Sequence, residues 1–110
     1  MNDPGIRPAP FGIAPTSAAK LRALFEASPG VDRVWIYGSR ARGDHRDASD
    51  IDLVVDAPSI SATDYVRLKG DVEALGLLYR VDVTRWQDVA DARFRVQIER
   101  DRKIDRKSVV

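Results

Sequence analysis

The hydrophobic positions of this chain follow two spacings, one typical of strands and one typical of helices. Short continuous apolar runs predict strands over residues 31–37, 50–56 and 79–84. Apolar residues three or four positions apart predict helices over about residues 16–27, 61–76 and 87–100. Strands interleaved with helices predict a small α/β (α+β) fold, in which helices cover one face of the sheet and the other face stays open.

Capping residues support these helix boundaries. Thr16 or Ser17 can cap the first helix, because their hydroxyls accept hydrogen bonds from free amides at a helix start. Ser61 or Thr63 can do the same for the second helix. Gly76 then ends the second helix, since glycine tolerates the backbone conformation that follows a last turn.

The chain of 110 residues is long enough for one domain with a single main core. Residues 1–15 hold four of the six prolines and two of the seven glycines, which predicts a flexible N-terminal arm. Residues 16–100 are expected to form the folded domain. Residues 101–110 alternate in charge and are expected to be a solvated tail.

Composition limits the classes of partner. The chain has 18 basic and 17 acidic residues and a net charge of +1, so no overall field favours nucleic acid. Its apolar runs are far shorter than a membrane span, and it lacks the apolar stretch of a secretion signal. The absence of cysteine fits a reducing compartment, so we expect a cytoplasmic protein.

A turn rich in potential phosphate contacts follows the first predicted strand. Gly38 comes directly after an apolar run and can adopt backbone conformations closed to other residues. If the next residues open a short helix, the free amides and the Ser39 hydroxyl point to one spot. This arrangement predicts a binding site for nucleotide phosphates.

Two carboxylates begin the second predicted strand. Asp50 and Asp52 lie two positions apart, so both side chains project from the same face, roughly 7 Å apart. Like charges at this spacing are costly unless a cation lies between them. Magnesium fits best, because it takes oxygen ligands from one or two carboxylates and substrate phosphates. A zinc site is disfavoured, since the chain has no cysteine and a single histidine, His45.

Gly38-Ser39, ten intervening residues and Asp50-Ile51-Asp52 together resemble the signature of the polymerase-β-like nucleotidyltransferases, specifically their minimal single-domain branch. This resemblance implies a small mixed sheet and a third acid on a later strand. The best match for that acid is Asp82, which points away from Val81 and Val83 in the third predicted strand.

The resemblance also implies roles in binding and catalysis. Asp50, Asp52 and Asp82 would hold two magnesium ions, Gly38 and Ser39 would hold ATP phosphates, and Arg40 or Arg42 would add positive charge. For both arginines, an exposed helix face is an equally good interpretation. His45 is expected to be an exposed loop residue.

Three functions are compatible with these residues. The resemblance implies an enzyme that transfers AMP from ATP to a hydroxyl, a tyrosine of a cognate HEPN ribonuclease toxin, and so acts as its antitoxin. The second is a binding module that neutralises its partner by occlusion. The third is transfer to a small molecule such as an aminoglycoside, which the lack of a second domain disfavours.

Overall fold

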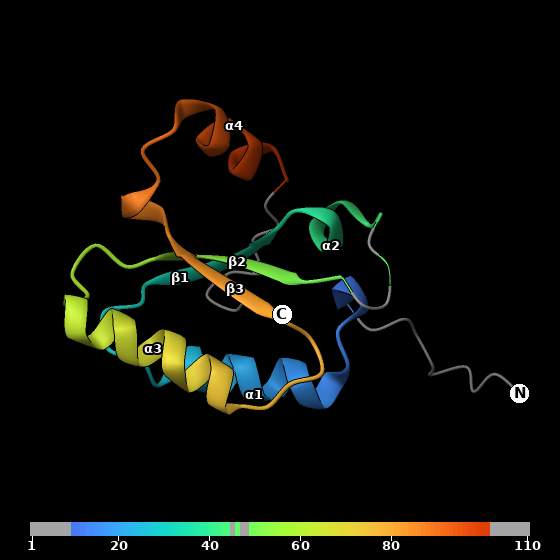
Figure 1. Ribbon diagram of the computed structural model, residues 1–110, viewed down its shortest axis with the longest axis horizontal. Helices are drawn as coiled ribbons and strands as arrows, with labels where there is room; N and C mark the ends of the chain where they lie inside the picture. The colour runs from blue at the N-terminus through green and yellow to red at the C-terminus, as the bar shows by residue number, and fades with distance from the viewer. Residues whose placement is uncertain (1–9, 45, 47–48, 102–110) are drawn as a thin grey trace, which may run out of the picture.

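The computed structural model describes residues 10–44, 46 and 49–101. The elements follow one another in the order η1 (Pro10–Gly12), α1 (Pro15–Glu26), β1 (Arg33–Tyr37), α2 (Ser39–Arg42), β2 (Ile51–Asp56), α3 (Ala62–Ala74), β3 (Val81–Arg85), η2 (Trp86–Asp88) and α4 (Ala92–Asp101). Helices α1 and α3 lie side by side on one side of the sheet, α4 lies on the other, and the short α2 lies at the end of β1 (Figure 1).

The sheet has three strands in the order β1-β2-β3. Strand β1 runs antiparallel to β2, and β3 runs parallel to it. The predicted small mixed sheet with interleaved helices is therefore confirmed. Because β2 is central, its side chains pack on both faces: Leu53 and Val54 are both fully buried although they point in opposite directions.

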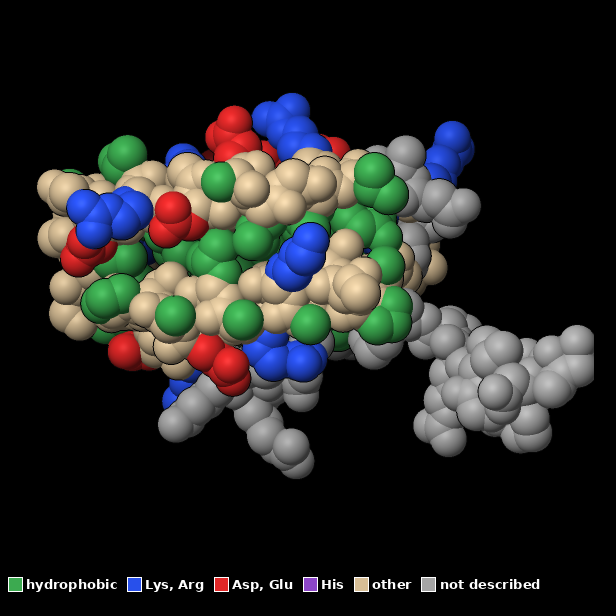
Figure 2. Space-filling model, turned by 90° about the horizontal axis from the view of Figure 1, so that it is seen from below, with side chains coloured by type: hydrophobic (Ala, Val, Ile, Leu, Met, Phe, Trp, Pro, Cys, Tyr) green, Lys and Arg blue, Asp and Glu red, His purple; other side chains and the backbone are tan. Residues whose placement is uncertain are grey.

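The main core lies between the sheet and helices α1 and α3. Alternate residues of the central strand enter it, as the spacing predicts, and all three are 0% exposed: Ile51, Leu53 and Val55. Leu21 and Phe25 of α1 and Leu68 and Val72 of α3 cover them. Seen from the side of these two helices, hydrophobic side chains form a band between them (Figure 2).

A second, smaller core covers part of the opposite sheet face. Helix α4 contributes Ile98 and Phe94, which pack with Trp35, Tyr37 and Val54. Trp35 also meets Trp86 edge to face, with ring centroids 6.1 Å apart, as expected for packing residues. The prediction that this face is open is therefore wrong in part, because α4 buries the β1 side of it.

The two ends of the domain also differ from the sequence prediction. Ile13 is 0% exposed in the main core, so the folded domain begins before Pro15 and the predicted arm is too long. Helix α1 begins at Pro15 without a side-chain cap, so the predicted hydroxyl cap is wrong there, whereas Ser61 does cap α3. Asp101, placed in a solvated tail by its sequence, is the buried last residue of α4.

Residues 1–9 and 102–110 of the predicted arm and tail lie outside the described residues. Within the part of the chain that is described, every helix is too short or too polar to cross a membrane.

Candidate active site

The turn after β1 brings the backbone against a carboxylate. Gly38 has φ 77° and ψ −154°, a combination that is essentially confined to glycine. A Cβ atom at this position would lie 2.8 Å from Oδ2 of Asp52, closer than real contacts allow. The turn and the acidic strand are therefore packed directly on each other, and Ser39 starts the short helix α2 beside them.

Asp52 and Asp82 are neighbours across the sheet. They are register partners on the parallel strands β2 and β3, so their side chains leave the same face about 5 Å apart. Val81 and Val83 contact the main core on the other face, as predicted. Asp50 is exposed and lies just before β2. The structure thus places Asp52 between the turn and Asp82.

The Asp52 carboxyl lies in an unfavourable environment for its own charge. Burial raises its pKa, and the Asp82 and Asp50 carboxylates raise it further. The Arg40 and Arg42 guanidinium groups act in the opposite direction and lower it. A pKa raised by burial and like charges is typical of functional sites, and a bound cation would relieve both effects.

Tyr37 is a site neighbour that sequence reasoning missed. It pairs in register with Asp52 across β1 and β2, and its ring packs edge to face on Phe94 with centroids 5.9 Å apart. Burial raises the pKa of its hydroxyl, a hydrogen bond with Thr84 lowers it, and the Asp52 and Asp82 carboxylates raise it. Its position directly before Gly38 was the available signal in the sequence.

Arg40 does not face the site. Its side chain is buried, at 2% exposure, and donates hydrogen bonds to the backbone carbonyl oxygens of Ser49 and Phe11. Both predicted interpretations, a phosphate contact and an exposed helix face, are therefore wrong for Arg40. Its guanidinium is directed at backbone carbonyl oxygens inside the protein.

Arg42 is exposed on α2 and holds two carboxylates. It donates to Asp44 at 3.2 Å and to the buried Asp101 at 2.8 Å. Asp101 also pairs with Arg100 at 3.1 Å, and these two arginines lower its pKa although burial acts in the opposite direction. Arg42 thus connects the short helix after Gly38 to the end of α4. Its contact with phosphate stays a prediction, and His45 lies outside the described residues.

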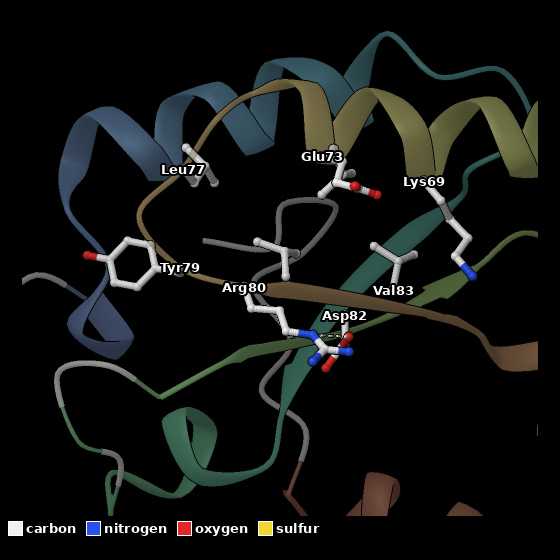
Figure 3. A pocket seen from close by; sticks show the side chains of 9 residues that line it. Lys69, Glu73, Leu77, Tyr79, Arg80, Asp82 and Val83 are labelled. Atoms are coloured by element: carbon white, nitrogen blue, oxygen red, sulfur yellow. Dashed lines mark ion pairs between the residues drawn. The ribbon is translucent and has the colours of Figure 1, made fainter.

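A groove of about 510 Å³ borders Asp82 between α3 and the edge strand β3. Figure 3 shows Lys69 and Glu73 of α3 on one side of it and Arg80, Asp82 and Val83 on the other. Arg80 and Asp82 form an ion pair at 3.4 Å, with both side chains largely exposed. Asp82 lines the groove at the edge of the sheet, while its carboxyl group points away from α3 (Figure 3).

The predicted cluster of three acids is only partly formed. Among the residues that the structure describes, no group of three or more Asp, Glu, His or Cys side chains is close enough to hold a metal. The predicted gathering of three acids is thus represented by the pair Asp52 and Asp82, with Asp50 near enough to affect the pKa of Asp52. A partial set of oxygen ligands suits magnesium that arrives with nucleotide phosphates.

Residues 19–105 match the protein family described as polymerase beta, nucleotidyltransferase. The chain belongs to this nucleotidyltransferase family. A solved structure described as a minimal nucleotidyltransferase agrees with this assignment: it is 36% identical, with a TM-score of 0.62, over 80% of this chain and 91% of the other. No curated protein matches the sequence of this nucleotidyltransferase.

Two more distant structures share the fold of this nucleotidyltransferase. A toxin–antitoxin solved with AMP-PNP has a TM-score of 0.61 at 22% identity, over 79% of this chain and 70% of the other. A mutant of the toxin–antitoxin MntA-HpeT has a TM-score of 0.58 at 21% identity, over 78% and 69%. At this level of identity, these likenesses show the fold.

Replacing Gly38 by alanine should disturb the site more than the fold. The backbone conformation costs about 1–3 kcal/mol for a residue with a Cβ, and that Cβ would also displace the Asp52 carboxylate. We expect nucleotide affinity to fall at least tenfold, measured by calorimetry with ATP and magnesium.

Gly43→Ala is the matched control for this prediction. Gly43 also has a positive φ, of 88°, but a Cβ there would meet nothing within 4 Å. The control should lose stability and keep its nucleotide affinity. Equal losses of affinity in the two variants would show that strain in the turn, and not the contact with Asp52, determines binding.

Proposed function

We propose that this nucleotidyltransferase depends on magnesium and transfers AMP from ATP to a hydroxyl, a tyrosine of a HEPN-type ribonuclease toxin, and thereby acts as an antitoxin. The observation that carries the proposal is the packing of Gly38 against the Asp52 carboxylate, with Asp82 in register beside it. This arrangement joins a phosphate-binding turn to oxygen ligands for a cation.

The chemistry of the acidic side chains suits magnesium, and the proposed reaction uses two ions. Asp50, Asp52 and Asp82 would hold them, and the raised pKa of Asp52 indicates a carboxyl whose ionised form a cation would stabilise. When bound, magnesium supplies charge neutralisation on the triphosphate and polarises the acceptor hydroxyl. The ion pair between Arg80 and Asp82 is exposed and weak enough to open when the acid takes up a metal ligand role.

The reaction follows from the positions of the groups. The amides after Gly38 and the Ser39 hydroxyl would hold the β- and γ-phosphates, which orients the α-phosphorus toward the acids. The acceptor oxygen forms a bond to the α-phosphorus while the bond from that phosphorus to the leaving pyrophosphate breaks. The hydroxyl proton passes to the Asp82 carboxylate, which lies beside Asp52 on the same face of the sheet.

The groove beside β3 offers a route for the acceptor. It borders β3 at the edge of the sheet, so an acceptor segment that passes over this edge and a nucleotide at Gly38 would meet at the acids. Its open shape suits a protein segment better than a small molecule, which favours the toxin over an aminoglycoside as acceptor. That a toxin–antitoxin of the same fold was solved with AMP-PNP supports a nucleotide as the donor.

A second candidate is an antitoxin that neutralises its partner by occlusion, without catalysis. The contact that favours it is the Arg80 side chain on Asp82, which occupies the carboxylate that the reaction needs. In this function the nucleotide site would contribute only to structure.

One experiment separates the two candidates. The protein is incubated with ATP, magnesium and the product of the adjacent gene, and intact mass spectrometry measures whether that product gains one AMP. We expect the adduct with the wild-type protein and none with the double variant Asp50→Ala, Asp52→Ala. Silencing of the partner by the double variant, or by the wild-type protein without any adduct, would favour occlusion instead.

A further inference from the structure

Arg40 is a buried charge whose contacts differ from the phosphate role predicted for it. Its side chain is among the largest fully buried ones in the protein, at 2% exposure. Burying a guanidinium is costly unless its donors are all satisfied by well-placed acceptors. Because Arg40 lies in the turn of the candidate site, the free-energy cost of burying its charge points to a role beyond packing.

The contacts of Arg40 join segments far apart in the sequence. Its Nε and Nη2 donate to the Ser49 carbonyl oxygen at 3.1 and 2.8 Å, and its Nη1 donates to the Phe11 carbonyl oxygen at 2.9 Å. The guanidinium also lies 4.8 Å from the centroid of the Tyr79 ring. We call these four residues, Arg40, Phe11, Ser49 and Tyr79, the arginine clamp.

The arginine clamp joins the turn after Gly38 to the residue that precedes Asp50. Arg40 lies in α2, two residues after Gly38, and Ser49 directly precedes Asp50. Ser49 is also tied to Arg46, because its amide donates to the Arg46 carbonyl oxygen and its hydroxyl accepts from the Arg46 amide. The bidentate contact to Ser49 therefore fixes where the chain enters β2 relative to the phosphate turn.

The N-terminal segment belongs to the same clamp. Phe11 has φ 58°, a left-handed conformation that is costly for a residue with a side chain, and its carbonyl oxygen is a partner of Arg40. The Tyr79 hydroxyl accepts a hydrogen bond from the Ala14 amide at 3.2 Å. Residues 11–14, which include the buried Ile13, are thus held by Arg40 at Phe11 and by Tyr79 at Ala14.

We propose that Arg40 is a positioning residue: the arginine clamp, including the N-terminal segment, sets the distance between the phosphate turn and the acids that begin β2. This inference rests on the proposed function, because the distance matters only if nucleotide and metal bind there. It also assigns a role to residues 11–14, which contain no part of the motif.

The test compares three arginine variants. Arg40→Met removes both the charge and the hydrogen bonds, whereas Arg40→Lys keeps the charge but cannot bridge two carbonyls with a planar fork. Arg67→Met, at an exposed position of α3, is the matched control for the loss of one positive charge. Calorimetry measures the affinity for ATP with magnesium, and hydrogen exchange measures the Ser49 and Ile51 amides.

If Arg40 is a positioning residue, Arg40→Lys should lose almost as much affinity for ATP with magnesium as Arg40→Met. We expect affinity to fall about tenfold or more in both, the size seen when groups that orient metal ligands are lost. The Ser49 and Ile51 amides should exchange faster in both variants, and the Arg67→Met protein should match the wild type. Full affinity in Arg40→Lys would overturn the inference, since charge alone would then suffice.

A deletion of residues 1–12 covers the case in which Arg40→Met does not fold. The deletion removes the Phe11 carbonyl but keeps Arg40 and the buried Ile13. It should weaken nucleotide affinity and speed exchange at Ser49, and unchanged values would overturn the inference. If the wild-type protein binds no ATP, the proposed function fails, while the exchange data still show whether the clamp holds the start of β2.

Discussion

Asp52→Asn is expected to lower the rate of AMP transfer by about 10³-fold, the upper range for losing one preorganised electrostatic group. Asp52 lies between the Gly38 turn and Asp82, so no other described acid can take its place. The substitution keeps the size of the side chain and removes its charge. The rate is measured as the appearance of the AMP adduct over time.

The same substitution should make the metal-free protein more stable. Burial and the neighbouring carboxylates raise the pKa of Asp52 above its ordinary value near 3.8. Between the ordinary pKa and the raised pKa of the folded state, the folded protein binds more protons than the unfolded chain. The free energy of unfolding therefore falls as the pH rises through that window. Asparagine removes this loss, and we expect a higher melting temperature for the variant at pH 7.

Magnesium and ATP provide the control for this stability effect. They should raise the melting temperature of the wild-type protein, because a ligand that binds the folded state stabilises it. The Asp52→Asn protein should respond far less. A variant that is less stable than the wild type without magnesium would show that the Asp52 carboxylate has a structural role.

Leu53→Ala should cause the largest loss of stability of any single truncation proposed for this protein. Leu53 is 0% exposed at the centre of β2, where it packs in the main core with helices α1 and α3. Removing a buried leucine costs about 2–5 kcal/mol, because lost burial and an unfilled cavity add together. That is a large share of the about 5–15 kcal/mol that stabilises a typical domain. Urea denaturation followed by circular dichroism gives the free energy of unfolding.

Val66→Ala is the control for the core truncation. Val66 lies on α3 but is 69% exposed, so its loss should change the free energy of unfolding by less than about 0.5 kcal/mol. A small effect at Leu53, comparable with that at Val66, would contradict the packing of β2 beneath the helices.

Much of the fold could be predicted from the spacing of apolar residues. The three strands and the helices α1 and α3 lie where the pattern places them, within a few residues at each end. Ser61 caps α3 as its side chain predicts. These features depend on neighbours close in sequence, for which residue type and spacing are sufficient information.

Some residues of the candidate site could likewise be predicted from the sequence, and others could not. Gly38 and Asp52 could be identified from the sequence, because a glycine directly after a strand and two acids at the start of a strand are patterns of neighbouring residues. The role of Arg40 could not, because its partners Phe11 and Ser49 are 29 and 9 positions away. An arginine in a turn near acids has the same sequence signal whether it faces phosphate or the protein interior.

The sequence by itself determined the alternation of strands and helices, the turn at Gly38 and the opposite directions of Asp52 and its core neighbours Ile51 and Leu53, because side-chain direction within a strand follows from position alone. The register that sets Asp82 beside Asp52 was decided by the pairing of β2 with β3. Only the tertiary structure decided that α4 covers part of that face and that Arg40 holds the start of β2 from within. It also decided that Asp101 is buried against Arg42. Such contacts depend on how distant segments pack, and many partners of similar chemistry compete for them until the chain is folded.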